Sequence, residues 1–218
     1  MSDLIAVEHR GHILTIGLNR PAKRNALNTE MFRGLSAAYT ELCDDPELRC
    51  GVLYSTGDLF TSGLDLQDMA PVLLNDEGDR TLTREDQVDP FNWASAGARR
   101  GRQRTKPIVT AINGRCFTAG IELALSTDIV IADADVVFAQ AEVRRGLMPL
   151  GGAIERFTTR FGWGNAMRHL LTGDAFDAAE AHRIGLVQEV VPVGQAKPRA
   201  LELAARIASA APIGSRGI

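Results

Sequence analysis

Short apolar segments alternate with helical segments along this chain, and that alternation constrains its fold more than any other feature. The segments CGVLYST (50–56), KPIVTAIN (106–113) and DIVIAD (128–133) carry charge only at their ends, as strands buried on both faces do. LIAVEHRGHILTIGLN (4–19) predicts a hairpin. Asn28 or Thr29 can cap a helix, because apolar residues recur after them at spacings of three and four. The pattern as a whole predicts an α/β fold.

Composition and charge exclude several classes of protein. The chain has 218 residues, 45% of them hydrophobic, and a net charge of −3, which argues against a nucleic-acid partner. No apolar run reaches the ~18 residues of a membrane helix, and the N-terminus lacks the pattern of a signal peptide. Cys43, Cys50 and Cys116 are odd in number and form no C-x-x-C pair. We therefore expect a reducing, cytoplasmic compartment.

One basic run and the histidines need a separate explanation. Five of the eight residues in RRGRQRTK (99–106) are Arg or Lys, but no aromatic residue is interleaved with them. We interpret the run as a solvated helix end. The four histidines have no ligand-like neighbours in the sequence, and no metal site is expected.

Glu122 is the charge that most needs an explanation, because it lies in the apolar stretch CFTAGIELALSTDIVIAD (116–133). It follows Ala119 in GRCFTAG (114–120), a predicted loop where the chain leaves a strand and enters a helix. The first backbone N–H groups of a helix lack internal partners, so they can hold an oxyanion. The loop FTSGLDL (60–66) has the same small-residue character before a helical start. Two such loops could supply two donors to one carbonyl oxygen.

A second acid, Glu142, follows twenty residues later in VVFAQAEVRRG, again among apolar residues. Two carboxylates beside a polarised carbonyl form an acid–base pair. The residues alone leave the question open, because buried glutamates are more often satisfied structurally and spacing does not establish proximity.

Several motifs, in the same order, resemble those of the enoyl-CoA hydratase/isomerase (crotonase) family. They are LNRPAKRNALN (18–28), LFTSGLDLQDM (59–69), the long segment from Lys106 to Gly152, and LLTGDAFDAAEAHRIGLVQEVVP (170–192). The resemblance implies a crotonase-like (ClpP/crotonase) spiral of ββα turns, with residues 1–194 as its core. Residues 195–218 would begin a helical C-terminal region that is cut short. Family members assemble as homotrimers or dimers of trimers.

The resemblance also implies a site. The backbone N–H groups of Leu64 and Ala119 match the oxyanion donors, although the second position is commonly glycine. Glu122 and Glu142 match the acid–base pair of the hydratases. Gln67 stands where the family often has a lysine, which puts one phosphate contact in question. No metal or redox cofactor is implied, because coenzyme A is part of the substrate. The residues matching the CoA-binding positions are Lys23, Arg24, Ala26, Ser62, Asp65 and Leu66.

The expected function is hydration of 2-enoyl-CoA to 3-hydroxyacyl-CoA, a lyase reaction of fatty acid β-oxidation. We assign Glu122 as the base and Glu142 as the acid, with the reverse division also open. A Δ3,Δ2-enoyl-CoA isomerase, another acyl-CoA reaction of the family, and a non-catalytic member are the alternatives. The segment VDPFNW (88–93) either shapes the acyl pocket or forms a surface insertion.

Overall fold

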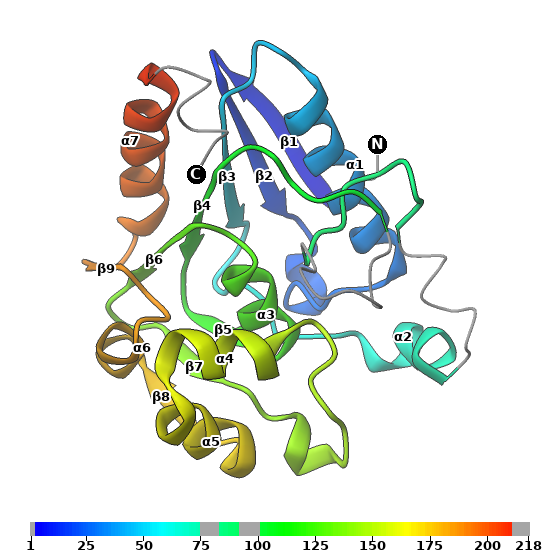
Figure 1. The fold of residues 1–218 in the computed structure, drawn as a ribbon, viewed down its shortest axis with the longest axis vertical. Coiled ribbons are helices and arrows are strands. Elements are labelled where there is room, and N and C mark those ends of the chain that lie inside the picture. The colour runs from blue at the N-terminus through cyan, green and yellow to red at the C-terminus, as the bar shows by residue number, and fades with distance from the viewer. Residues whose placement is uncertain (1–2, 75–82, 92–100, 211–218) are drawn as a thin grey trace.

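The computed structural model describes residues 3–74, 83–91 and 101–210. Within these residues the main sheet has the strand order β1-β2-β3-β4-β6-β9, in which only the β1–β2 hairpin is antiparallel (Figure 1). Both the hairpin and the α/β class are confirmed. The strands of this sheet are β1 (Ile5–Arg10), β2 (Ile13–Leu18), β3 (Cys50–Ser55), β4 (Ile108–Ile112), β6 (Ile129–Asp133) and β9 (Glu189–Val191).

Both faces of the main sheet are covered, which explains why its central strands are almost wholly apolar. Successive residues of β3 and β4 belong to different cores: Leu53 and Ile108 pack on one face, whereas Val52 and Val109 pack on the other. This alternation follows from the two-residue period of a strand.

Helices α1 (Thr29–Asp44) and α7 (Ala196–Ser209) cover opposite sides of the main sheet (Figure 1). The side chain of Asn28 accepts the N–H of Met31 and begins α1, as predicted. Helix α7 presents small residues at every fourth position, which lets its backbone approach the strands closely. These residues are Ala196, Ala200, Ala204 and Ala208.

A second sheet joins β5 (Arg115–Phe117), β7 (Val137–Ala139) and β8 (Ala175–Asp177). The sequence predicts only a loop over 114–120, and this expectation is wrong for β5. Three residues are too few to show a hydrophobic period. They become a strand because β7 pairs with them in parallel.

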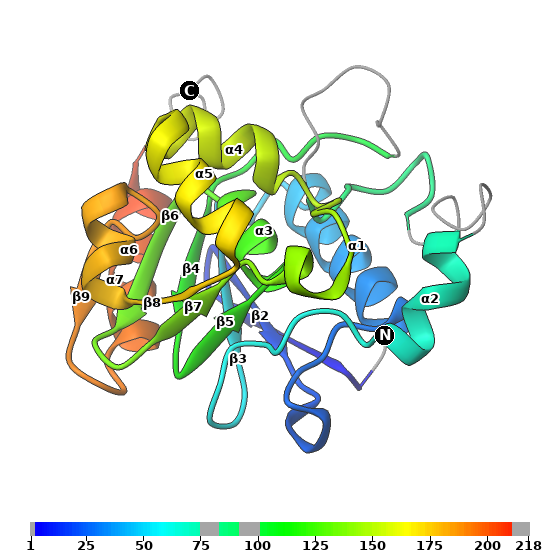
Figure 2. The ribbon, with the colours of Figure 1, turned by 90° about the horizontal axis from the view of Figure 1, so that it is seen from below.

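The remaining helices lie mostly beside the small sheet, where Figure 2 shows α3, α4 and α5 grouped together. Of the helices in the described ranges, none has the length and hydropathy needed to cross a bilayer. Their bounds are η1 (Pro21–Lys23), α2 (Leu66–Leu74), α3 (Ala119–Leu125), η3 (Glu142–Arg145), α4 (Ala153–Phe161), α5 (Trp163–Thr172) and α6 (Ala178–Ile184).

The basic run does not form a solvated helix end. Residues 99 and 100 lie outside the described ranges, and residues 101–106 contain no helix. Arg104 has a side chain that is 6% exposed and pairs with Asp128 at 2.7 Å. Lys106 is buried, and its ammonium donates to the carbonyl of Asp45 at the C-terminal end of α1. These cations are compensated by an acid and by the negative end of a helix dipole, a pairing that local sequence does not reveal.

Candidate active site

Glu122 lies in the middle of α3 and is 3% exposed. Its Oε1 accepts the N–H of Gly151 at 2.7 Å and the N–H of Ala153 at 3.1 Å. Its Oε2 accepts no hydrogen bond from the described residues. One oxygen of this carboxyl group is therefore held by the backbone, while the other remains available.

The environment of Glu122 favours its neutral form. Burial, and then the negative charge of Glu142, raise its pKa from 4.5 to about 7. The two N–H donors and Arg156 act in the opposite direction, but they do not outweigh burial. A carboxyl group with a pKa near neutrality exchanges protons readily at physiological pH.

Glu142 begins η3, just after β7, and is half-buried. Its Oε1 accepts the side-chain amide of Gln140 at 2.9 Å, while its Oε2 is buried and has no partner among the described residues. Burial raises its pKa as well. The structure thus brings the two sequence-predicted acids into electrostatic contact, each with one oxygen held and one oxygen unpaired.

The two predicted oxyanion loops also meet. The N–H of Thr61 donates to the carbonyl of Arg115 at 3.1 Å, and the N–H of Phe117 returns to the carbonyl of Thr61 at 3.1 Å. The loop 60–66 therefore runs beside β5, which leads into α3. Neither the N–H of Leu64 nor that of Ala119 donates to another described residue. Both groups are therefore available to donate to a new oxygen acceptor.

Thr118 orients the peptide that carries the Ala119 N–H. It has φ 49° and ψ −116°, which is rare for a β-branched residue. Its N–H donates to the carbonyl of Ala139 at 2.9 Å, and its own carbonyl accepts the N–H groups of Ile121 and Glu122. Hydrogen bonds on both sides hold this unusual backbone in place.

The residues expected to bind CoA form one connected region. The N–H of Ser62 donates to the carbonyl of Arg24 at 3.1 Å. Arg20 connects two more of these residues, because its Nη1 donates to the carbonyl of Ala26 at 3.0 Å and to Asp65 at 2.8 Å. The side-chain bond from Arg20 lowers the pKa of Asp65. Lys23 and Leu66 are exposed at the edge of this region.

Sequence reasoning missed Gly151, Gln140 and Arg20. Gln140 lies only two residues before Glu142, so proximity in sequence could have identified it. A Cβ on Gly151 would lie 2.6 Å from Oε2 of Glu122, so no larger residue fits there without displacing the carboxyl group. No sequence signal connects Gly151 to Glu122, because their contact spans 29 residues.

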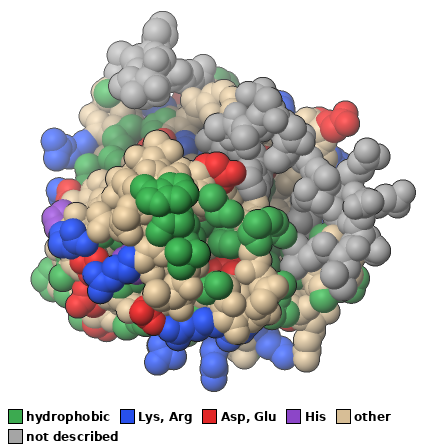
Figure 3. Space-filling view, turned by 60° about the horizontal axis from the view of Figure 1, so that its bottom comes forward, with side chains coloured by type: hydrophobic (Ala, Val, Ile, Leu, Met, Phe, Trp, Pro, Cys, Tyr) green, Lys and Arg blue, Asp and Glu red, His purple; other side chains and the backbone are tan. Residues whose placement is uncertain are grey.

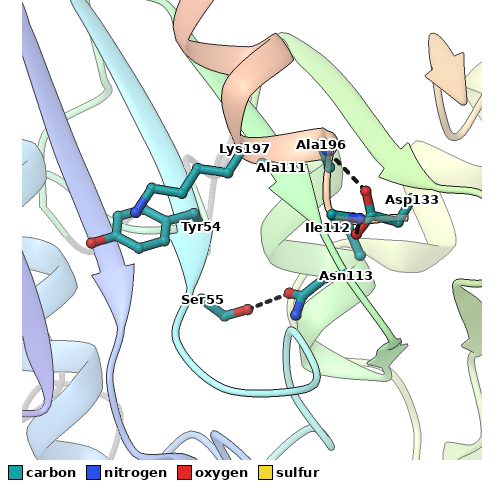
Figure 4. A pocket seen from close by; sticks show the side chains of 9 residues that line it. Tyr54, Ser55, Ala111, Ile112, Asn113, Asp133, Ala196 and Lys197 are labelled. Atoms are coloured by element: carbon teal, nitrogen blue, oxygen red, sulfur yellow. Dashed lines mark hydrogen bonds between the residues drawn. The ribbon is translucent and has the colours of Figure 1, made fainter. Parts of the chain in front are cut away.

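A pocket of about 150 Å³ lies elsewhere, where the N-terminus of α7 meets the ends of β3, β4 and β6 (Figure 4). Its polar groups already have partners: Ser55 donates to Asn113 at 2.7 Å, and Asp133 accepts the N–H of Ala196 at 2.9 Å. Lys197 stands 3.4 Å from the centroid of the Tyr54 ring. None of the predicted site residues lines this pocket. The pocket lies at the junction between α7 and the main sheet.

No group of three or more His, Cys, Asp or Glu side chains within the described ranges has the spacing of a metal site.

A sequence model described as enoyl-CoA hydratase/isomerase matches residues 8–217. The enoyl-CoA hydratase EchA19 of Mycobacterium tuberculosis is 37% identical over 97% of this chain and 77% of its own length. The 2,3-dehydroadipyl-CoA hydratase of Escherichia coli is 33% identical over 98% of this chain and 78% of its own length.

Solved structures are similar along nearly the whole chain. A probable enoyl-CoA hydratase/isomerase from Mycobacterium abscessus superposes with a TM-score of 0.89 at 48% identity, covering 98% of this chain and 79% of its own. An enoyl-CoA hydratase from Mycobacterium tuberculosis superposes with a TM-score of 0.81 at 32% identity, covering 98% and 79%. The α/β fold described above is therefore that of these enzymes.

Proposed function

This chain belongs to the enoyl-CoA hydratase/isomerase family, and from that premise we propose that Glu122 and Glu142 add water to a 2-enoyl-CoA. The protein is an enoyl-CoA hydratase, and its product is a 3-hydroxyacyl-CoA. One observation carries the catalytic assignment. The charge of Glu142 acts on Glu122, and each acid keeps one oxygen without a protein partner among the described residues.

The thioester carbonyl oxygen would lie against the N–H groups of Leu64 and Ala119. Negative charge develops on that oxygen as the double bond is polarised, so preorganised donors stabilise the transition state more than the ground state. The absence of an acceptor on either N–H among the described residues supports this role. Loss of one such donor typically costs about 3–4 kcal/mol of transition-state stabilisation.

The acids would divide the proton transfers between them. Ionised Glu122 takes a proton from water as the water oxygen bonds to the β-carbon, and protonated Glu142 gives a proton to the α-carbon. Burial raises the pKa of both acids, and the charge of Glu142 raises that of Glu122 further. This supports a proton shared by the pair, because two close carboxylates do not readily ionise together. The reaction is redox-neutral, so it needs no redox cofactor.

Coenzyme A would bind along the region formed by Lys23, Arg24, Ala26, Ser62, Asp65 and Leu66. The cations at 23 and 24 are exposed and suit phosphate groups. The bonds from Arg20 keep Ala26 and Asp65 together beside the first oxyanion loop. This connected arrangement supports a single binding surface for the nucleotide end of the substrate.

The test is turnover of crotonyl-CoA by the wild-type protein and by Glu122→Gln, Glu142→Gln and Glu155→Gln. Glu155 is an exposed glutamate on α4 and is the control. We expect kcat to fall by orders of magnitude in the first two variants with modest change in KM, and to stay unchanged in the third. Near-normal turnover in both active-site variants refutes the assignment. Product analysis on 3-enoyl-CoA separates hydration from isomerisation.

We also propose that copies of this chain assemble as a trimer or a dimer of trimers. Hydrophobic side chains gather on the side of the molecule that carries α4 and α5 (Figure 3), and such surfaces mark protein contacts. Sedimentation analysis tests the assembly, and a monomeric mass contradicts it. The exposed apolar residues on this side are Val143, Leu147, Met148, Leu150, Ile154, Trp163 and Leu171.

The three free cysteines support a cytoplasmic location, because disulfides are rare in that compartment.

A further inference from the structure

Arg156, on α4, turns back over the N-terminus of its own helix. Its Nη1 donates to the carbonyl of Gly151 at 3.0 Å, and its Nη2 donates to the carbonyl of Phe91. The guanidinium is partly buried. It therefore ties together two backbone segments that are 60 residues apart in sequence.

These two segments enclose Glu122. Gly151 donates its N–H to Oε1 of the glutamate at 2.7 Å. A Cβ on Gly151 would lie 2.6 Å from Oε2 of Glu122 and 2.9 Å from Cε1 of Phe91. The carboxyl group and the aromatic ring both pack against Gly151 without spare room, so a shift of Gly151 would move the carboxyl group.

The segment that ends at Phe91 is itself well anchored. Ser36 of α1 donates to the carbonyl of Val88 at 2.8 Å, and Ser126 donates to the carbonyl of Pro90 at 2.9 Å. Residues 88–90 are buried. The described part of VDPFNW is therefore not a surface insertion, whereas residues 92 and 93 lie outside the described ranges. The segment to which Arg156 bonds at Phe91 is therefore also held by hydrogen bonds from Ser36 and Ser126.

The charges around Arg156 give it a second effect. Burial, and then Arg160 on α4, lower the pKa of Arg156, whereas Glu122 on α3, Asp89 before Phe91 and Glu155 on α4 favour its cationic form. Around Glu122, the charge of Glu142 disfavours ionisation and the charge of Arg156 favours it. A base must be ionised to take a proton. The charge of Arg156 thus acts on the pKa of Glu122 in the direction opposite to the charge of Glu142.

We propose that Arg156 is a positioning residue for hydration, which fixes the carboxyl group of Glu122 through Gly151 and Phe91 and favours its charged form. The inference rests on the proposed function, in which Glu122 is the base. Its two effects are separable, because a lysine retains the charge but lacks the planar fork that reaches two carbonyl oxygens at once.

The first measurement does not depend on turnover. The carboxyl carbon of Glu122 is followed by ¹³C NMR titration of glutamate-labelled protein, with Glu122→Gln assigning the signal. In Arg156→Gln we expect the midpoint to move to higher pH, and in Arg156→Lys to remain near that of the wild type. Arg160→Gln, one turn along α4, is the control and should not move it. An unchanged midpoint in Arg156→Gln overturns the electrostatic role.

The second measurement is hydration of crotonyl-CoA as a function of pH. The acidic limb of the profile should move to higher pH in Arg156→Gln only, while kcat of Arg156→Lys at the plateau should fall roughly tenfold to a hundredfold. Wild-type kcat in Arg156→Lys overturns the positioning role, even if Arg156→Gln does not fold. A wild-type protein without hydratase activity refutes the proposed function instead, and the titration still decides the effect of Arg156 on Glu122.

Discussion

Replacing Glu122 by glutamine should stabilise the folded protein at alkaline pH while it abolishes turnover. The amide oxygen of glutamine can still accept the N–H groups of Gly151 and Ala153, as Oε1 does now. The substitution therefore preserves the shape and the held oxygen of the side chain. What it removes is a negative charge in a site where the side chain is 3% exposed.

The size of the effect follows from the pKa of Glu122, which burial and Glu142 raise from 4.5 to about 7 in the folded protein. The folded state therefore binds a proton at Glu122 more tightly than the unfolded chain does. The stability that this protonation contributes is complete below pH 4.5. It is lost as the pH rises through about 7. A difference of about 2.5 units, at 1.36 kcal/mol per unit, amounts to about 3 kcal/mol.

Urea unfolding of the wild type and Glu122→Gln at about pH 5 and about pH 8.5 measures this difference. We expect the variant to gain most of the ~3 kcal/mol between the two conditions. Glu155→Gln, which removes an exposed glutamate from α4, is the control for general charge effects. The reasoning fails if the advantage of Glu122→Gln is equal at both pH values, or if the wild type is the more stable protein at pH 8.5.

Three further predictions follow from the same geometry. Gly151→Ala should lower kcat by roughly a hundredfold, because its Cβ would displace the carboxyl group of Glu122; Gly164→Ala, with open space around the new methyl group, should leave the hydration rate unchanged. Asp133→Ala should cost about 2 kcal/mol in urea unfolding, because Asp133 accepts three N–H groups at the start of α7; Asp135→Ala, which removes an exposed acid, is the comparison. The kcat/KM of the wild type should fall on the acidic side with a midpoint near 7, the pKa of Glu122, and a limb near pH 4.5 would contradict the assignment of this residue as the base.

Sequence alone determined the features that depend on short-range interactions. Asn28 begins α1 because its side chain accepts the N–H of Met31, only three residues later in the sequence. The central strands are apolar because both faces of a parallel sheet are covered. Glu122 and Glu142 stood out because a charge is conspicuous in an apolar stretch. The family resemblance then suggested their roles.

Only the tertiary structure decided how the acids are held. Gly151 holds Glu122 across 29 residues of sequence, and this contact does not follow from hydrophobic period or capping. The three-residue strand β5 exists only because β7 pairs with it. The pKa of Glu122 likewise depends on burial and on charges from other elements. Packing and electrostatics at a distance have no local signature, so the chain had to fold before its two glutamates acquired an environment suited to proton transfer.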